Sequence, residues 1–263
     1  LVDLYDTVRQ KDRYYELPRL NIYRTDSLAP VGEPIELTEF LDNSRRKMLV
    51  EETKGGDKVK SAKFDYVVGN PPYVRVQRLQ DIIERYRQHY QSASGLFDIF
   101  VLFLESAIRW LKECGKLGFI VSNMFMTRGY GLSIRNLVLG SCKIQQIVDF
   151  GDSGVFKEVT NYPCIFILKK TSDNEERNKN ILTYVRVIRP VRTEVKGMEI
   201  DRTLDEIRKR VDTKKYSSEY FDIFEWPQNK LTSQSWEMMP IKEKDTFGSI
   251  EKESEYRLRD VIE

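Results

Sequence analysis

Residues 64–76 read FDYVVGNPPYVRV, and this stretch decides how the chain folds. Its first half is an apolar, β-forming run that passes through Gly69 into Asn70. Aromatic and β-branched residues in such a run predict a short buried strand. Pro71 and Pro72 then stop the strand, because neither can donate a hydrogen bond to a sheet. The sequence thus raises the question of why a buried strand ends on a carboxamide, two prolines and Tyr73.

Helices and strands alternate after this stretch. Apolar residues recur at three- and four-residue spacing over Asp98–Lys112, which predicts an amphipathic helix that stops at Gly115. A continuously apolar run, Leu117–Val121, predicts a strand covered on both faces. Two more strands are predicted at Ile144–Phe150 and Cys164–Leu168. This alternation implies a mainly parallel α/β sheet with its ligand site at the carboxyl ends of the strands.

The character of the chain changes near residue 171. Between a short predicted strand at residues 20–23 and the strand at 64–68, the polar interval 42–62 predicts an exposed insertion. The turn-rich sequence TSDNEERNKN at 171–180 predicts a boundary or an exposed hairpin. A β-rich piece (Ile181–Ile188), a charged helix (Leu204–Val211) and an aromatic segment (Tyr220–Trp226) follow. We therefore expect a catalytic domain over residues 1–171 and an α+β extension over residues 172–263.

Bulk composition limits the classes of function. The 263 residues are 40% hydrophobic, which is enough to fill the core of a globular protein. Lys and Arg number 43, Asp and Glu number 41, and the net charge is +2. This balance neither supports nor excludes a nucleic-acid partner.

Cysteine and histidine usage argues against disulfide and metal chemistry. The three cysteines are far apart and lack C-x-x-C spacing, which predicts reduced thiols and no metal site. The one histidine, His89, is expected on a helix surface. No apolar run reaches the roughly 18–20 residues of a membrane span, and the N-terminus lacks the layout of a signal peptide. We expect a soluble, cytoplasmic protein.

The chemistry of Asn70-Pro71-Pro72-Tyr73 follows from its acceptor atoms. Each proline restricts the residue before it to extended geometry and lacks an N–H, so the carbonyls of this corner have few local donors. The Asn70 amide oxygen and the Pro71 carbonyl oxygen together suit a planar –NH2 group. Two such hydrogen bonds favour a pyramidal nitrogen whose lone pair is free to attack, so no strong base is required. Tyr73 is then placed to stack on a flat base.

The same tetrapeptide has a plainer interpretation, because G-N-P-P is also ordinary turn chemistry. Its position immediately after an apolar strand in an α/β pattern favours function.

With these residues, the sequence resembles the N6-adenine DNA methyltransferases that use S-adenosylmethionine, in particular their Eco57I-like branch of restriction-modification and phage-defence enzymes. Residues 95–123 (GLFDIFVLFLESAIRWLKECGKLGFIVSN) resemble that family's next helix and strand, and residues 128–135 (RGYGLSIR) resemble its YG-x-x-[LI]R segment. The resemblance covers about residues 20–170. It implies a partial Rossmann-like methyltransferase core, S-adenosylmethionine as cofactor, double-stranded DNA as partner, and methyl transfer to an adenine amine.

The resemblance also implies roles for further residues. Asp26, after a short predicted strand, matches the acidic residue that binds the adenine amine of the cofactor, with the Ser27 backbone beside it. Asp98 and Phe103 match the segment that lines the cofactor pocket. Phe156 matches the aromatic residue that stacks on the extruded target adenine, opposite the tyrosine of NPPY.

Each of these roles has an alternative that stays open. Asp26 also suits a turn or helix N-cap, Phe103 also suits core packing, and Phe156 also suits an exposed loop. The arginines after the motif suit either phosphate contacts or a solvated helix face; they are Arg75, Arg78, Arg85 and Arg87.

The sequence departs from the family pattern near both ends. The family's glycine-rich cofactor loop is expected upstream of Asp26, yet the 25 residues before Asp26 contain no glycine. Residues 254–263 (SEYRLRDVIE) resemble the first strand of a target-recognition domain. We therefore expect an internal piece of a larger enzyme, which holds the chemical motif but lacks the glycine loop.

Two other functions stay open. NPPY also serves enzymes that methylate the glutamine amide of translation factors, because a carboxamide nitrogen is conjugated in the same way. The YG segment, the insertion before the motif and the extension past residue 171 argue against that activity. In the second alternative, the chain is a non-catalytic DNA-binding or assembly segment that keeps the motif as scaffold.

Overall fold

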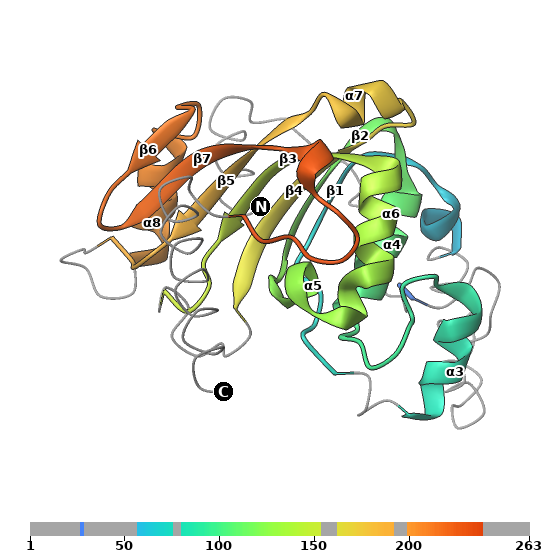
Figure 1. Cartoon of the computed structure of the whole chain (residues 1–263). Helices are drawn as coiled ribbons and strands as arrows, with labels where there is room; N and C mark the ends of the chain where they lie inside the picture. Colours follow the sequence, from blue (N-terminus) through green and yellow to red (C-terminus); the bar gives the residue numbers. More distant parts are fainter. Residues whose placement is uncertain (1–26, 29–56, 76–79, 154–161, 192–198, 239–263) are drawn as a thin grey trace, which may run out of the picture. The chain divides into compact units, whose positions relative to one another are not determined.

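A computed structural model of the chain describes residues 27–28, 57–75, 80–153, 162–191 and 199–238. The chain divides into two compact units, Leu1–Ala62 and Lys63–Glu263. In the first unit, the structure describes a bend at 27–28 and a helical turn at 57–61. The second unit contains the NPPY motif and an α/β sheet (Figure 1).

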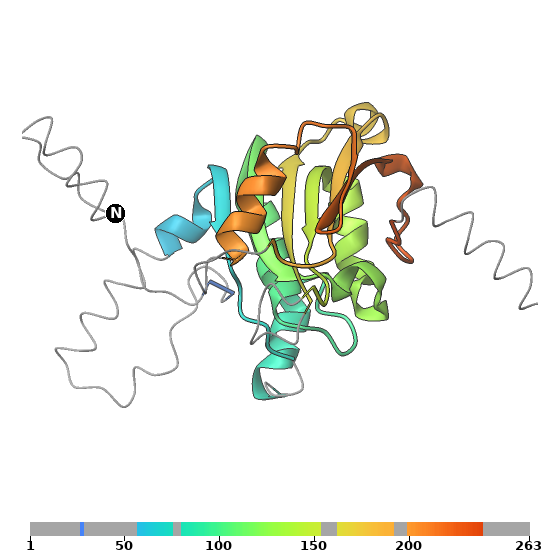
Figure 2. The ribbon, with the colours of Figure 1, turned by 90° about the vertical axis from the view of Figure 1, so that its left-hand side faces the viewer.

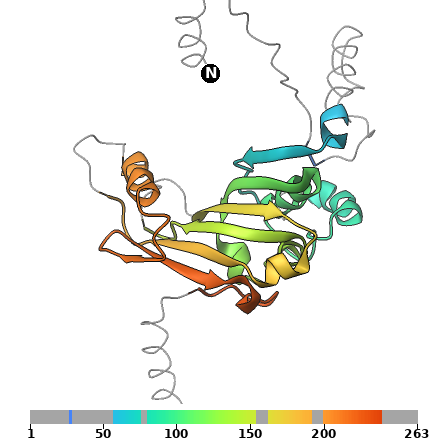
Figure 3. The ribbon, with the colours of Figure 1, turned by 90° about the horizontal axis from the view of Figure 1, so that it is seen from above.

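The described residues of the second unit form a seven-stranded sheet in the order β1-β2-β4-β3-β5-β7-β6 (Figure 3). The strands are β1 (Phe64–Gly69), β2 (Leu111–Ser122), β3 (Cys142–Asp149), β4 (Pro163–Lys170), β5 (Ile181–Val187), β6 (Lys215–Ser217) and β7 (Phe221–Pro227). β1 is parallel to β2 and β3 is parallel to β5, while β4 is antiparallel to both β2 and β3. The carboxyl ends of β1, β2, β3 and β5 therefore meet at one edge, where β4 begins.

The prediction of a mainly parallel sheet is wrong for β4 and β7. β4 returns antiparallel between β2 and β3, and β7 runs antiparallel to β5. The sequence between β3 and β4 shows no helical periodicity, and a parallel crossover normally needs a helix. The predicted α/β fold with a Rossmann-like arrangement is confirmed in its other features, as a twisted sheet with helices on both faces.

Helices lie on both faces of the sheet (Figures 1 and 2). The helices are α3 (Gln80–His89), α4 (Phe100–Trp110), α5 (Met124–Thr127), α6 (Leu132–Ser141), α7 (Asn174–Asn178) and α8 (Glu199–Arg208), with 3-10 turns η3 (Gly129–Gly131) and η4 (Gln228–Lys230). On one face, Ile207 of α8 packs with Val148, Val185 and Ile223. On the opposite face, α4, α5 and α6 cover the sheet, and burial of their apolar side chains is the main stabilising contribution.

The helix predicted over Asp98–Lys112 ends earlier than expected. α4 stops at Trp110 and β2 starts at Leu111, so the prediction of Gly115 as a helix stop is wrong. A Cβ atom on Gly115 would lie 3.0 Å from the Phe64 carbonyl oxygen. The glycine therefore permits the close approach of β1 and β2, a requirement that is set by tertiary structure.

β1 forms as predicted but is less buried than expected. Tyr66 is 72% exposed and Val68 is 81% exposed. Among the described residues β1 pairs with β2 alone, which makes it an edge strand of the described sheet. An apolar run predicts a strand, but its neighbours decide how much of it is covered.

Beyond residue 171 the sheet continues, because β5 pairs with β3. The turn-rich stretch contains the short helix α7, and the Asp173 carboxylate caps its N-terminus by accepting hydrogen bonds from the Glu175 and Glu176 N–H groups. The prediction of a hairpin there is therefore wrong. The predicted strand from Ile181 and the charged helix are confirmed as β5 and α8, and the aromatic segment forms β7.

The described residues include no helix long and apolar enough to cross a membrane. They also include no group of three His, Cys, Asp or Glu side chains arranged to hold a metal ion. All three cysteines are free thiols, and His89 is exposed at the end of α3.

Candidate active site at the carboxyl edge of the sheet

The NPPY motif lies at the carboxyl end of β1. Asn70 directly follows the last residue of the strand and is exposed, whereas Pro71 is buried. Among the described residues, no hydrogen bond reaches the Asn70 side chain or the Pro71 carbonyl oxygen. The two oxygens that the sequence predicts as amine acceptors thus have no protein donor in the described part of the chain.

Tyr73 is held from one side by the core. Its half-buried ring meets Phe100 edge-on, with the ring centroids 6.3 Å apart. Its hydroxyl is buried and has no hydrogen-bond partner in the described structure. Burial, and to a smaller extent the nearby Cys164 thiol, raises the pKa of Tyr73 to about 12. Tyr73 is therefore a neutral phenol at physiological pH. It can contribute an aromatic ring to the site but not a proton-accepting phenolate.

A row of aromatic rings supports this tyrosine. Phe100 meets Phe125 at a centroid distance of 6.2 Å, and Phe125 meets Phe166 at 5.4 Å and Trp236 at 5.8 Å. The rings of Phe100, Phe125, Phe166 and Trp236 are all buried. Because interiors are close-packed, the row gives the Tyr73 ring a rigid support.

Asp98 lies beside the motif. Arg75 and Asp98 form an isolated antiparallel bridge, and the Ile99 N–H donates to the Val74 carbonyl oxygen at 2.8 Å. The Asp98 Oδ2 atom accepts a hydrogen bond from the Tyr130 hydroxyl at 2.9 Å. Burial, and then the Asp98 carboxylate, raises the pKa of Tyr130 far above its ordinary value. The NPPY, FDIF and YG segments thus converge on one place.

Arg135, at the end of the YG segment, is fully buried. Its guanidinium donates to the carbonyl oxygens of Phe125 and Arg128, and to those of Ser233 and Gln234 at 2.7 Å each. The last two belong to residues 231–238, which we call the strap. The guanidinium therefore ties the strap to α5 and to the turn that follows it.

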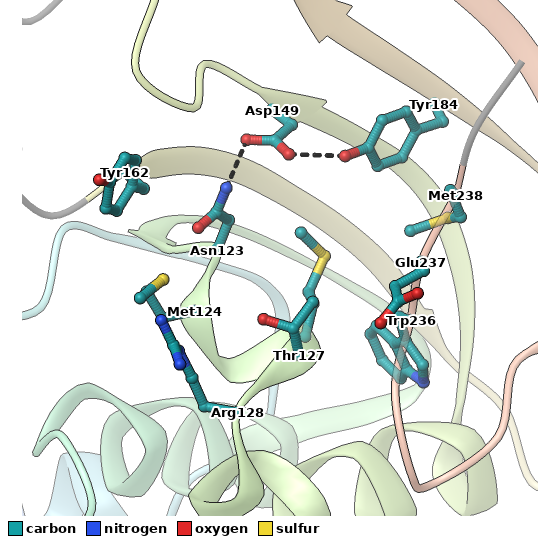
Figure 4. Close-up of a pocket in the computed structure, with 11 residues that line it drawn as sticks. Asn123, Met124, Thr127, Arg128, Asp149, Tyr162, Tyr184, Trp236, Glu237 and Met238 are labelled. Carbon is teal, nitrogen blue, oxygen red and sulfur yellow. Dashed lines mark hydrogen bonds between the residues drawn. The ribbon is translucent and has the colours of Figure 1, made fainter. Parts of the chain in front are cut away.

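A polar network occupies the ends of the neighbouring strands (Figure 4). Asn123 follows β2 and donates from Nδ2 to Asp149 Oδ1 at 2.8 Å. The Gly151 N–H donates to the same oxygen at 2.9 Å, and the Tyr184 hydroxyl donates to Oδ2 at 2.6 Å. Burial and the Asp149 charge raise the pKa of Tyr184. Both carboxylate oxygens are occupied, which fixes the orientation of the Asn123 amide.

A pocket of about 340 Å³ opens beside this network. It lies between α5, the ends of β3 and β4, and the strap (Figure 4). Its lining includes Met124 and Arg128 from the α5 region, Tyr162 from the start of β4, and Glu237 and Met238 from the strap.

Comparison with known families agrees with this arrangement. The family model of the Eco57I restriction-modification methylases matches residues 11–156, which is more than half of the chain. The chain belongs to the Eco57I family. The match includes the NPPY motif, the FDIF helix and the YG segment, and it confirms the resemblance predicted from those residues.

Named relatives are consistent with the Eco57I family. The Type II methyltransferase M.BstVI of Geobacillus stearothermophilus is 37% identical over 134 residues, which are 50% of this chain and 24% of the relative. The Type II restriction enzyme and methyltransferase RM.Eco57I of Escherichia coli is 34% identical over 116 residues, 42% of this chain and 12% of the relative. The chain thus spans about a quarter or less of the length of these relatives.

A solved structure with a similar arrangement is the type IIG restriction endonuclease BpuSI. The TM-score is 0.47 at 17% sequence identity, and the alignment covers 67% of this chain and 21% of that chain.

The structure brings together only some of the predicted site residues. The NPPY residues and Asp98 lie at the same edge, and Phe103 is half-buried on α4. Ser27 lies in the first unit, in the bend at 27–28, and is half-buried. Asp26 and Phe156 lie outside the described residues.

Sequence reasoning missed Asn123 and Asp149. Each stands where an apolar strand ends, which is the signal that singled out Asn70, so the rule for carboxyl ends would have found both. Tyr184 and Trp236 gave no such signal, because their roles depend on contacts with distant segments.

Proposed function

We propose that this chain is the part of an Eco57I-family enzyme that transfers a methyl group from S-adenosylmethionine to the N6 amine of an adenine turned out of double-stranded DNA. The observation that carries the proposal is the exposed Asn70 at the carboxyl end of β1, beside the Pro71 carbonyl, with no protein donor among the described residues. The type II methyltransferases among its relatives support DNA as the substrate.

The residues of the motif have distinct roles in this reaction. The Asn70 amide oxygen and the Pro71 carbonyl oxygen accept the two hydrogens of the adenine amine. These two contacts would direct the amine nitrogen toward the methyl group that bound S-adenosylmethionine would supply, and the nitrogen would lose one proton to solvent as the methyl group is transferred. Tyr73 stacks on the base as a neutral ring, with Phe156 opposite it. A base inside a duplex cannot present its amine, so the adenine must be extruded.

The residues beside the motif fit the cofactor. Asp98 accepts from Tyr130 with one oxygen, and its other oxygen has no donor among the described residues, so it is open to an amine or hydroxyl of the cofactor. Phe103 is half-buried and offers a ring to a flat ligand. When bound, S-adenosylmethionine supplies the electrophilic methyl group. We assign Asp26 and Ser27 to the adenine end of the cofactor.

Methyl-labelled S-adenosylmethionine tests this function in the full-length parent enzyme. Duplex DNA is digested to nucleosides after the reaction, and a translation release factor is offered as substrate in a parallel reaction. The expected product is labelled N6-methyladenine. Label on a glutamine amide of the release factor would identify the other methyltransferase activity. DNA binding without any methyl transfer would identify the non-catalytic scaffold.

A further inference from the structure

The pocket at the carboxyl edge is a site that the chemistry of Asn70 does not use. Its volume of about 340 Å³ lies within the range of small-molecule sites. Asn70 and Tyr73 are not among the residues that line it. Met124 and Met238 contribute polarizable apolar walls, which adapt well to flat ligands.

The polar part of the pocket is arranged to accept hydrogen bonds. The Asn123 amide nitrogen is engaged by Asp149, and the amide oxygen has no donor among the described residues. The exposed Glu237 carboxylate lines the strap side of the pocket (Figure 4). An oriented amide oxygen and a carboxylate favour a ligand with N–H groups, such as the exocyclic amine of a nucleobase.

Tyr162 adds a flat aromatic surface. It is 41% exposed, and its φ of 46° is in the left-handed region that non-glycine residues rarely occupy. Its carbonyl oxygen accepts a hydrogen bond from the Asn123 N–H at 2.8 Å, which ties the two residues together. Such backbone strain is typical of ligand sites, where the surrounding structure holds it in place.

Arg128 supplies a cation to the same pocket. Its side chain is exposed, and it forms no ion pair with a carboxylate within the described ranges. A guanidinium without a carboxylate partner binds a phosphate well, because its planar N–H groups match the phosphate oxygens.

We propose that this pocket binds a nucleobase of the DNA next to the methylated adenine, with a phosphate of that nucleotide on Arg128. This inference rests on the proposed function and names a second base site for it. β1 and β4 are separated by β2, and adjacent strands lie about 4.8 Å apart, so β4 lies roughly 10 Å across the sheet from β1. This separation places the pocket beyond the target base and within reach of an adjoining nucleotide in a strand distorted by base extrusion.

Methyl NMR of methionine tests the site directly in the whole 263-residue chain. Met124, Met126 and Met238 line the pocket, and their methyl signals are assigned by single substitutions of these methionines. The probes are dAMP, dCMP and dGMP, which carry exocyclic amines, dTMP, which does not, and a short oligodeoxyadenylate. We expect the pocket methyl signals to shift with the first three probes and with the oligonucleotide, and dTMP to bind about tenfold more weakly.

Matched variants decide whether the shifts report this pocket. Asn123→Ala and Arg128→Gln should each weaken binding at least about fivefold, whereas the exposed Asn136→Ala on α6 and Arg202→Gln on α8 should not change it. No methyl shift with any probe, or shifts that Asn123→Ala leaves unchanged, would overturn the proposal. Binding of mononucleotides but not of the oligonucleotide would overturn DNA as the source.

A separate variant distinguishes this failure from failure of the proposed function. Asn70→Ala should leave the methionine shifts intact, because Asn70 does not line the pocket. Loss of the shifts in that variant would place the bound base at the NPPY corner and contradict a second site. An absence of methyl transfer by the parent enzyme, with the shifts retained, would reject only the proposed function.

Discussion

The Tyr130 hydroxyl donates a 2.9 Å hydrogen bond to Asp98 Oδ2, and the two residues are 32 positions apart in the sequence. The contact joins the YG segment to the segment proposed to line the cofactor pocket. We propose that Tyr130 is a positioning residue, which orients the Asp98 carboxylate and does not contact the reacting amine.

Tyr130→Phe removes this contact and keeps the ring. A hydrogen bond to a charged group contributes about 1.5–3 kcal/mol, so we expect the Kd for S-adenosylmethionine to rise by about tenfold or more, with kcat within about twofold of the parent value. Calorimetric titration and steady-state kinetics measure the two effects. Tyr66→Phe, which changes an exposed tyrosine of β1, is the control. A collapse of kcat with unchanged cofactor affinity would contradict a positioning role.

Gly131→Ala should destabilise the protein, because a Cβ atom there would lie 1.9 Å from the Phe125 carbonyl oxygen. We expect the free energy of unfolding to fall by about 1–3 kcal/mol or more, as in other overpacked cores. Gly129→Ala, two residues earlier, meets nothing within 4 Å and should be nearly neutral. Urea unfolding compares the two variants, and equal stabilities would show that the close approach is absent.

Arg135→Met should loosen the strap. The substitution leaves four carbonyl oxygens without this donor, one of them buried and three part-buried, which we expect to cost roughly 3–5 kcal/mol of unfolding free energy. Limited proteolysis should then cut the strap faster. Arg202→Met on α8 is the control, because its ion pair with Glu206 is half exposed and contributes roughly 0–1 kcal/mol. If the Arg135→Met variant resists protease as well as the unsubstituted protein does, Arg135 does not hold the strap in place.

Tyr73→Phe should preserve activity, because the proposed role uses the ring and the buried hydroxyl has no partner in the described structure. We expect the free energy of unfolding at neutral pH to stay the same or rise by up to about 1 kcal/mol. Tyr73→Ala, in contrast, removes the ring and should abolish binding of the extruded adenine. A large loss of activity in Tyr73→Phe would show that the hydroxyl takes part in the reaction.

The raised pKa of Tyr73 leads us to expect that the free energy of unfolding depends on pH. The Tyr73 pKa is raised from 10.0 to about 12 in the folded state, so the folded protein holds this proton more tightly than the unfolded chain does. Its contribution to stability is complete below pH 10 and is lost as the pH rises from 10 to 12. Unfolding measured across that window should therefore show a shallower decline in Tyr73→Phe than in the parent protein. Parallel declines would place the Tyr73 hydroxyl in water.

Local signals in the sequence predict strand β1 and the place where it ends. The apolar run before Gly69 and the two prolines after Asn70 specify a strand that stops at an edge, and the structure has that strand at Phe64–Gly69. The helical spacing from Phe100 likewise predicts α4, because its buried face is encoded within one segment.

Features that depend on distant contacts could not be predicted in this way. The direction of β4 depends on pairing with β2 and β3, and the end of α4 depends on how closely β1 approaches Gly115. Trp236 lies far from the motif in sequence, yet its ring packs on Phe125 in the row that supports Tyr73. No local pattern encodes such contacts, since they form only when separate segments fold together.

Single-turnover methyl transfer to adenine N6 by Asn70→Ala, in the full-length parent enzyme, tests the central claim most directly. Asn136→Ala is the matched control, and binding of S-adenosylmethionine and DNA is measured for both variants. We predict that Asn70→Ala slows transfer by at least about a hundredfold. The affinities for S-adenosylmethionine and for DNA should both stay within about twofold of those of the unsubstituted enzyme. Transfer at the parent rate by Asn70→Ala would contradict the assignment of Asn70 as the acceptor that activates the amine.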